Sequence, residues 1–480
     1  MNEKALQNTI DRCREKNIII PTYEQMKHPE RIPASILERL KQVGLWDLDP
    51  VNLFRITWKN DAVTGGFGKV NYLEFPKEIT GTKARVLALV GKYFPTGAHK
   101  VGATFGPLVS RLVSGEFDPT RQKAVWPSTG NYCRGGAFNS YLLGCEAVAI
   151  LPEGMSRERF EWLHRVGAEV IATYGCESNV KEIYDKCHEL IATRGDEVVV
   201  LNQFAEFGNP LWHYEVTGAA MQEVMESEVG PGFGLAGVVA STGSAGTIAC
   251  ADFLRTKWPL MKVCASEALQ CPTLLYNGYG GHRIEGIGDK HIPWVHNLRN
   301  TDMVAGIDDE DTIRLIRLFN DPLGREYLVD RGVPADFVER LGLVGISGVC
   351  NLLTAIKMAK YYELDETDVV FTVLTDSMEL YSSRINELRD ERGAYTREQA
   401  AADYDRCLLG QKTDWLLELS YLERKRIHNL KYFTWIEQQG YAIDELNAQW
   451  YDKNYWKDHF GQAPSMNSKI EAFNDKVGLP

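Results

Sequence analysis

The sequence predicts an α/β fold with mostly parallel sheets and helical extensions at both ends of the chain. Two observations carry this prediction. From about Ala84 to Tyr381, short runs of β-branched and aliphatic residues alternate with amphipathic stretches of helical period. The short runs are apolar throughout instead of alternating between apolar and polar residues. This is typical of parallel strands covered by helices on both faces.

Composition limits the class of protein. A chain of 480 residues is too long for one compact core, so we expect roughly two or three domains. A net charge of -12 and a pI near 5.5 argue against nucleic-acid binding. No apolar run reaches the roughly 20 residues that cross a bilayer, and the polar N-terminus lacks the apolar core of a signal peptide. The ten cysteines form no CxxC pair or Cys/His cluster, so a reduced, cytoplasmic protein without a metal site is expected.

The expected elements follow in chain order. Residues 1–80 form an N-terminal extension of helices and proline-bearing turns, with a strand over 53–58 that leads into the main body. The strands of the main body are expected over 85–90, 124–126, 146–151, 168–173, 197–201, 235–240, 262–265 and 368–374. Residues 392–480 form a helical, tryptophan-containing C-terminal extension. The sequence leaves open whether this extension packs on its own subunit, covers an active-site mouth or forms an oligomer surface.

Lys100 is the first candidate for chemistry. It lies in the segment Lys-Tyr-Phe-Pro-Thr-Gly-Ala-His-Lys-Val over 92–101, just after a Pro/Gly turn and just inside a predicted helix. Such a helix start favours anions, and Schiff-base chemistry requires a rigidly held, partly desolvated lysine amine. By itself the segment favours an ordinary solvated lysine, and other segments reverse that interpretation.

Two further loops follow strands at the side of the sheet where α/β proteins bind ligands. In 128–137 (Ser-Thr-Gly-Asn-Tyr-Cys-Arg-Gly-Gly-Ala), small residues and helix-start N–H groups suit a carboxylate, although a plain connection is the alternative. In 241–247 (Ser-Thr-Gly-Ser-Ala-Gly-Thr), hydroxyls, glycines and amides suit a phosphate. The second loop lacks the Gly-Lys-Ser/Thr ending of a P-loop and the register of a dinucleotide-binding motif.

Lys100 and these loops together resemble the tryptophan synthase β family of pyridoxal-phosphate enzymes (fold type II), which includes cysteine synthase and cystathionine β-synthase. The resemblance extends from Asn52 to about Arg384, and its motifs are closest to cysteine synthase. The segments that carry it are 150–159, 167–171, 202–204, Asn209-Pro210, His213, Thr217-Gly218, 282–288 and 374–381.

The resemblance implies a two-domain tryptophan synthase β-like fold, with a smaller domain over 92–205 and a larger one formed by 81–91 and 206–391. It implies that Lys100 forms the internal aldimine with pyridoxal 5'-phosphate and that Asn131 faces the phenolic oxygen of the cofactor. The implied phosphate-binding residues are Thr242, Gly243, Ser244, Ala245, Gly246 and Thr247. The implied substrate-carboxylate residues are Thr129, Gly130 and Asn131.

Ser377 falls where the family places a neutral hydroxyl against the pyridine nitrogen. A neutral partner suits elimination and replacement at Cβ better than transamination. The adjacent Asp376 is the alternative, and it would keep the nitrogen protonated.

Two departures from cysteine synthase bear on the substrate. The Thr-Gly-Ala-His-Lys segment is similar to tryptophan synthase β, and His99 either contacts the phosphate or is a satisfied helix-start histidine. Arg134 lies in a loop that is simpler in cysteine synthase. It either binds an anionic side chain of the substrate or forms an outward salt bridge.

The resemblance implies a pyridoxal-phosphate-dependent transferase or lyase acting at Cβ of an amino acid. We expect β-replacement on a serine-type amino acid through an aminoacrylate first, and β-elimination of the cysteine desulfhydrase or serine/threonine dehydratase type second. The expected partners are a small amino acid, sulfide as a candidate co-substrate and a second subunit in a homodimer. A non-catalytic binding or regulatory homologue and a nucleotide-binding α/β protein remain as other classes.

Overall fold

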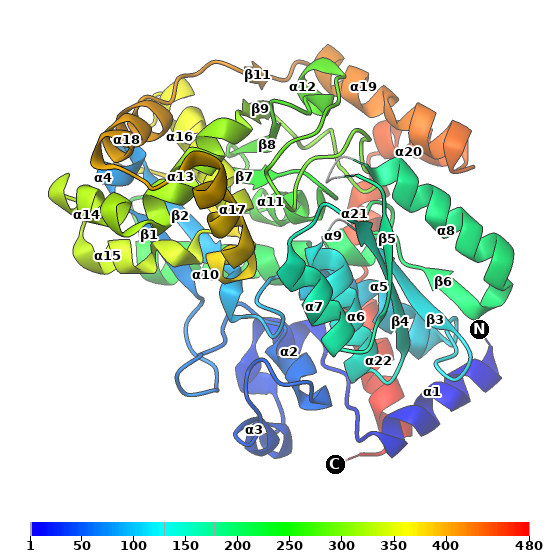
Figure 1. Cartoon of the computed structure of the whole chain (residues 1–480). Coiled ribbons are helices and arrows are strands. Elements are labelled where there is room, and N and C mark those ends of the chain that lie inside the picture. The colour runs from blue at the N-terminus through cyan, green and yellow to red at the C-terminus, as the bar shows by residue number, and fades with distance from the viewer. Residues whose placement is uncertain (1, 129, 176–178, 480) are drawn as a thin grey trace.

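The computed structural model describes residues 2–128, 130–175 and 179–479. In this part of the chain the strands form two sheets, one of seven strands and one of four, and helices surround both (Figure 1). Neighbouring strands are parallel except at the two edges of the larger sheet. The predicted α/β class with mostly parallel sheets and helical extensions is therefore confirmed.

The larger sheet has the strand order β1-β2-β10-β7-β8-β9-β11. Its strands are β1 (Tyr72–Phe75), β2 (Arg85–Val90), β7 (Gly234–Ser241), β8 (Lys262–Ala268), β9 (Met303–Ile307), β10 (Asp368–Leu374) and β11 (Leu416–Glu418). The smaller sheet has the order β5-β4-β3-β6. Its strands are β3 (Lys123–Pro127), β4 (Glu146–Pro152), β5 (Glu169–Thr173) and β6 (Val198–Val200).

Both faces of strand β2 are buried, which explains its continuous apolar run. Leu87 and Leu89 belong to one hydrophobic cluster, whereas Val86 and Ala88 belong to another. Successive side chains of a strand point to opposite faces of the sheet, so an apolar residue is needed at every position. The burial pattern therefore records the covering of this sheet by helices on both sides.

Helices cover the two sheets and build the two extensions. The principal helices of the main body are α5 (Lys100–Ser114), α6 (Asn131–Leu142), α7 (Arg157–Arg165), α8 (Val180–Arg194), α9 (Gly208–Trp212), α10 (Gly218–Val224), α11 (Ala249–Leu254), α13 (Asp309–Asn320), α14 (Pro322–Asp330), α15 (Ala335–Glu339), α16 (Ile346–Tyr361) and α17 (Ser382–Arg392). The extensions contribute α1 (Glu3–Glu15), α2 (Tyr23–Lys27), α3 (Ala34–Leu40), α18 (Arg397–Ala402), α19 (Tyr421–Asn429), α20 (Ile443–Tyr451), α21 (Tyr455–Phe460) and α22 (Ala463–Val477).

The strand predicted over 53–58 is wrong. Residues Pro50–Arg55 form a 3-10 helix that begins at Pro50, and the Asp49 side chain caps it by accepting a bond from the N–H of Val51. The first strand of the sheet is β1 instead. The apolar residues of 53–58 are buried as predicted, but a proline at the first helical position and a capping aspartate favour a helical turn over a strand.

The C-terminal extension packs on its own chain. Figure 1 shows α22 beside α1, close to both chain ends. The Arg14 Nε donates to the carbonyl of Val477 at 2.9 Å, and the N–H of Ile20 donates to Asn474 Oδ1 at 3.1 Å. Strand β11 also pairs with β9, so the extension adds an edge strand to the larger sheet. Of the arrangements left open by the sequence, the structure shows the extension packed on its own subunit.

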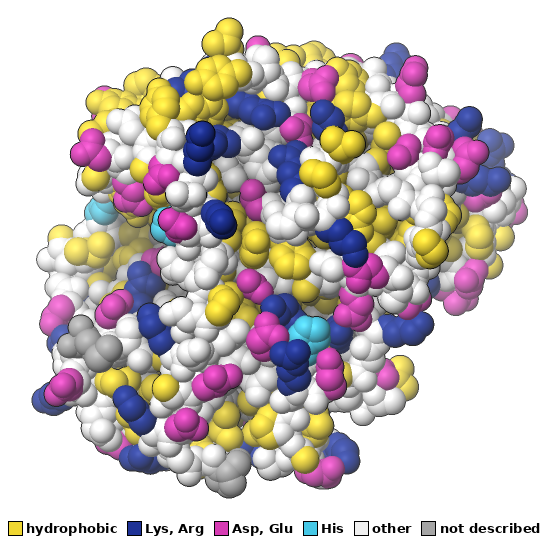
Figure 2. Space-filling model, turned by 180° about the vertical axis from the view of Figure 1, so that it is seen from behind, with side chains coloured by type: hydrophobic (Ala, Val, Ile, Leu, Met, Phe, Trp, Pro, Cys, Tyr) yellow, Lys and Arg dark blue, Asp and Glu magenta, His cyan; other side chains and the backbone are white. Residues whose placement is uncertain are grey.

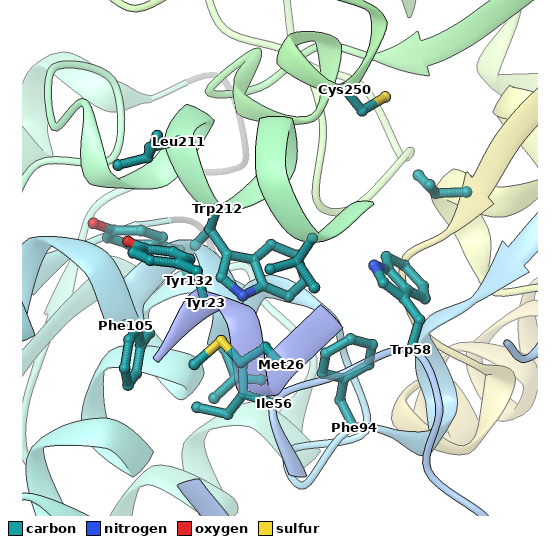
Figure 3. Packing of buried hydrophobic residues seen from close by; sticks show 14 of the residues in the cluster. Tyr23, Met26, Ile56, Trp58, Phe94, Phe105, Tyr132, Leu211, Trp212 and Cys250 are labelled. Carbon is teal, nitrogen blue, oxygen red and sulfur yellow. The ribbon is translucent and has the colours of Figure 1, made fainter. Parts of the chain in front are cut away.

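An aromatic cluster supports the first turn of α5. Trp58, Phe94 and Trp212 lie edge to face or tilted against one another (Figure 3). A Cβ at Gly102 would overlap the Trp212 indole, so glycine allows this ring to lie directly against α5. The cluster fixes the position of the helix on which Lys100 is the first residue.

Candidate active site

A small cavity lies where strands β2, β10 and β7 end. These three strands are neighbours and parallel, so their carboxyl ends meet at one edge of the sheet, which is the usual ligand site of such sheets. The residues that line the cavity are Lys100, Ala240, Ser241, Gly243, Ala245, Thr247, Gly286, Ile287, Asn351, Val373 and Thr375. The structure thus brings Lys100 and the 241–247 loop together, although 140 residues separate them in sequence.

The Lys100 amine is held at the wall of this cavity. Its Nζ donates to Ser244 Oγ at 3.2 Å, and no carboxylate lies within ion-pair distance in the described part of the chain. Burial lowers the pKa of the Lys100 amine to about 8. A sizeable fraction of the amine is therefore neutral near pH 7 to 8, and a neutral amine is the nucleophile in Schiff-base formation.

The 241–247 loop presents free backbone donors to the cavity. Among the described residues, the N–H groups of Gly243, Ser244 and Ala245 have no hydrogen-bond acceptor. Ala245 has a φ of +59°, a left-handed conformation that turns the chain between strand β7 and the following helical segment. Consecutive free N–H groups beside a lysine amine fit the phosphate of pyridoxal phosphate.

Neighbouring side chains hold this loop in place. Asn209 Nδ2 donates to Ser244 Oγ at 3.1 Å, and a Cβ at Gly246 would overlap the buried Asn209 amide. The Thr242 hydroxyl donates to the carbonyl of Ser266 at 3.0 Å. Of the predicted phosphate-binding residues, Gly243, Ala245 and Thr247 line the cavity, whereas Thr242 and Gly246 support the loop from behind.

The asparagine loop lies at the start of α6. Thr129 lies outside the described residues, and the N–H of Gly130 donates to Ser128 Oγ at 3.1 Å. Asn131 Nδ2 donates to Asp376 Oδ2 at 2.6 Å, and Asn131 Oδ1 is buried without a partner. The predicted roles of Thr129, Gly130 and Asn131 stay predictions, and the structure adds that Asn131 is joined to the end of β10.

Asp376 is the centre of a buried network that the sequence did not predict. Its Oδ2 also accepts from the Tyr381 hydroxyl at 2.7 Å, and Arg159 Nη2 donates to that hydroxyl at 2.9 Å. Arg159 forms an ion pair with Glu285 at 3.3 Å. Burial raises the pKa of Asp376. Arg159, Glu285 and Tyr381 all lie in segments that resemble the family, but nothing in their spacing shows that they meet.

Thr375, not Ser377, lines the cavity at the end of β10. Thr375 Oγ1 lies 3.2 Å from His99 Nε2, and burial holds the pKa of His99 well below its usual value, so the imidazole is neutral. Ser377 is buried two residues further along the chain, at the cap of the next helical turn. The role of Ser377 stays a prediction, with Thr375 as a second candidate.

Arg134 lies one turn after Asn131 on α6. Its Nη2 donates to the carbonyl of Thr96 at 3.0 Å, in the loop that precedes Lys100, and its guanidinium lies 4.8 Å from the Trp162 ring. The outward salt bridge considered for Arg134 is excluded, because its side chain is 4% exposed. No group of three or more His, Cys, Asp or Glu residues suited to a metal ion is found among the described residues.

Comparison with known proteins shows the family to which this chain belongs. Residues 70–376 match the family model described as pyridoxal-phosphate dependent enzyme. Cysteine synthase from Staphylococcus aureus is 30% identical over 260 residues, which are 54% of this chain and 75% of that protein. Cystathionine beta-synthase from Saccharomyces cerevisiae is 25% identical over 319 residues, 65% of this chain, and the match spans 59% of the yeast protein.

Solved structures show the same fold. O-acetyl serine sulfhydrylase isoform 3 from Entamoeba histolytica aligns with a TM-score of 0.59 at 20% identity, over 79% of this chain and 97% of that one. A hydrogen sulfide-producing enzyme from Fusobacterium nucleatum aligns with a TM-score of 0.55 at 23% identity, over 69% and 91%. The predictions of family, fold and cofactor are confirmed: this chain belongs to the pyridoxal-phosphate-dependent enzymes.

Proposed function

We propose that this chain catalyses β-replacement on a serine-type amino acid with pyridoxal phosphate as cofactor, and that β-elimination is the second candidate. The observation that carries the proposal is the Lys100 amine, which is partly neutral near pH 8 and lies beside the free N–H groups of Gly243, Ser244 and Ala245. The class of reaction agrees with relatives that are named cysteine synthase and cystathionine beta-synthase.

In this proposal, different residues of the chain bind the cofactor, position the Lys100 amine and transfer the proton. Pyridoxal phosphate, when bound, withdraws electrons from Cα of the amino acid. The loop over 243–245 holds the phosphate through its N–H groups. Lys100 binds the cofactor and then moves the proton at Cα, for which a pKa near the working pH is suited. Ser244 positions the amine through its hydroxyl, 3.2 Å from Nζ.

The residues that follow strand β10 favour a neutral partner for the pyridine nitrogen of the cofactor. Asp376 Oδ2 is bonded to Asn131 and Tyr381, which turns this carboxyl group towards α6, and the Thr375 and Ser377 hydroxyls are the neutral groups beside it in the chain. A neutral hydroxyl does not hold a proton on the ring, which suits loss of a β-substituent. We therefore retain a neutral hydroxyl, Ser377 or Thr375, as the expected partner.

The remaining expectations concern partners and location. A small amino acid and sulfide are the proposed substrates, and a homodimer in the cytoplasm stays a prediction. None of the described helices combines the length and apolar character required to span a bilayer. On the face shown in Figure 2, cationic and anionic side chains are interspersed.

The test is a substrate screen of the cofactor-loaded protein. O-acetylserine, O-phosphoserine, serine, cysteine and threonine are each supplied with and without sulfide, and cysteine and pyruvate are measured. Cysteine formation that requires sulfide supports replacement, whereas pyruvate formed without sulfide favours elimination. A protein that shows the visible absorbance of the cofactor but turns over none of these amino acids contradicts both, and supports a non-catalytic role.

A further inference from the structure

Arg134 is a buried cation whose hydrogen bonds are incomplete. Its side chain is 4% exposed, and its single hydrogen bond in the described part of the chain is to the carbonyl of Thr96. Its Nε and Nη1 atoms are buried without any acceptor, and no carboxylate lies within ion-pair distance of it among the described residues. A guanidinium removed from water in this way is costly unless an anion compensates it.

The other fully buried cations of the described chain are compensated. The Arg55 guanidinium donates to three carbonyls and to the Asn52 side chain. Lys431 donates to two carbonyls and to Gln449, and Arg159 pairs with Glu285. Arg134 therefore differs from these three cations because its side chain makes one hydrogen bond and no ion pair among the described residues.

The position of Arg134 connects it with the active site. It lies one helical turn after Asn131, so both side chains are on the same side of α6, and it bonds to Thr96, four residues before Lys100. Asn131 Oδ1 and Asp376 Oδ1 are also buried without partners. These two oxygens accept hydrogen bonds and so suit a donor group of a ligand, whereas the unpaired Nε and Nη1 of Arg134 are the donors that suit an anion.

We propose that Arg134 binds a negatively charged β-substituent of the amino-acid substrate, such as a phosphoryl group. This inference rests on the proposed function and specifies its substrate class. The proposed function gives the loop over 243–245 to the cofactor phosphate, and the family resemblance implies that residues 129–131 bind the α-carboxylate. Arg134, one turn further along α6, has unpaired Nε and Nη1 donors for a second anionic group. Trp162 covers its guanidinium and orients it.

The Asp376 carboxyl group does not compensate the charge of Arg134 in place of the proposed substrate anion. It is the carboxylate whose charge most favours the charged form of Arg134, but its Oδ2 is bonded to Asn131 and Tyr381 and no ion pair joins it to Arg134. Burial also raises the pKa of Asp376 and so disfavours its charged form. The positive charge of Arg134 is left for a ligand.

The reaction with O-phosphoserine is balanced with sulfide as the second substrate. The Cβ–O bond breaks and its electron pair leaves with inorganic phosphate, and a Cβ–S bond forms from sulfide. The proton that leaves Cα is returned to it. In this reaction Arg134 binds the phosphoryl oxygens and stabilises the charge on the departing phosphate.

The experiment compares O-phosphoserine with O-acetylserine in the cofactor-loaded enzyme. We expect the wild type to have the larger kcat/KM for O-phosphoserine with sulfide. Arg134→Gln is expected to reduce the ratio of the two kcat/KM values by roughly 10- to 150-fold, the range for one hydrogen bond to a charged group. Arg134→Lys keeps the charge without the planar fork and is expected to lose less. The absorbance change of the cofactor on adding O-phosphoserine gives a binding constant that does not depend on turnover.

Arg157→Gln is the matched control. It removes an arginine that is 77% exposed on the adjacent helix α7, and the ratio is expected to stay within twofold of the wild type. An Arg134→Gln enzyme that loses activity equally on both substrates overturns the inference, because Arg134 would then bind the α-carboxylate. A wild type that uses O-acetylserine but does not bind O-phosphoserine overturns the inference and leaves the proposed function intact. A wild type that uses neither amino acid overturns both.

Discussion

Asn131 on α6 donates its amide to Asp376 at the end of β10, with 2.6 Å between Nδ2 and Oδ2. This bond joins a helix that follows a strand of the smaller sheet to a strand end of the larger sheet. The Tyr381 hydroxyl donates to the same carboxylate oxygen. One buried carboxyl group thus contributes to the relative position of the two halves of the site, together with bonds such as the one from the Ser383 hydroxyl to Glu158.

Tyr381→Phe tests the contribution of the hydrogen bonds around Asp376. It removes the hydroxyl that joins Arg159 to Asp376, and leaving a buried polar group without its hydrogen-bond partner costs about 1 to 3 kcal/mol of unfolding free energy. Turnover is also expected to fall, because Asp376 and Asn131 lose their position. Urea unfolding and kcat/KM measure the two effects.

Tyr395→Phe is the matched control for that variant. The Tyr395 hydroxyl donates to the buried Asp403 carboxylate, also at 2.7 Å, at a place that does not line the cavity. We expect a similar loss of stability with unchanged kcat/KM. Equal loss of turnover in both variants would show that Tyr381 acts only through stability.

The pKa of Lys100 predicts how the stability of the cofactor-free protein depends on pH. The folded-state pKa is about 8 and the usual value is 10.5, so between these pH values the unfolded chain binds the extra proton and stability rises with pH. Below pH 8 both states are protonated, and the buried charge opposes folding by up to about 3 kcal/mol, from about 1.4 kcal/mol per pKa unit.

The Lys100→Met variant allows the contribution of the Lys100 amine to the pH dependence of stability to be measured. At pH 7 the cofactor-free variant is expected to be more stable than the cofactor-free wild type, and the difference is expected to shrink as the pH rises from 8 towards 10.5. Urea unfolding of both proteins at matched pH values gives the difference. Parallel stability curves over this range would mean that the amine titrates at its ordinary pKa.

Gly243→Asp tests whether the loop over 243–245 binds the phosphate of the cofactor. A Cβ here would be in ordinary contact with the Gly286 carbonyl at 3.5 Å, so the main effect of the aspartate is its charge beside the phosphate. We expect at least a tenfold weaker affinity for pyridoxal phosphate, measured by fluorescence titration. Gly234→Asp adds the same charge at the exposed start of the same strand, where a Cβ meets nothing within 4 Å. Identical affinities in the two variants would place the phosphate elsewhere.

Thr375→Val and Ser377→Ala separate the two candidate partners of the cofactor ring. Because Thr375 lines the cavity, its loss is expected to shift the visible absorbance of the bound cofactor more than the loss of Ser377. Each is expected to cost about 1 kcal/mol of cofactor affinity at most, as for one neutral hydrogen bond. A larger shift for Ser377→Ala would restore the role that the family resemblance implies for it.

The fold class was predictable because continuous apolar runs in the sequence indicate strands that are buried on both faces. The run over 85–90 is apolar at every position, and both faces of β2 are covered. The same reasoning failed for 53–58, where buried apolar residues belong to a 3-10 helix that Asp49 and Pro50 begin. Strand β11 has three residues, and its pairing with β9 depends on tertiary contacts that no local pattern shows.

The local geometry of the candidate site was predictable where it depends on the backbone of a single loop, whereas the roles of its residues stay predictions. Free N–H groups at 243–245 follow from the local turn, and Lys100 from a helix start after a Pro/Gly turn. Partners from distant segments were not predictable. Arg159 and Glu285 are 126 positions apart, and neither their spacing nor their neighbours indicate that they form a buried ion pair.

The most direct test of this account locates the covalent bond to the cofactor. The yellow protein is reduced with borohydride, digested, and the modified peptide is identified by mass spectrometry. We expect a pyridoxyl group on Lys100, and Lys100→Ala is expected to lose both this adduct and turnover while keeping its fold. An adduct on another lysine, or an undiminished rate in Lys100→Ala, would contradict the assignment of the active site.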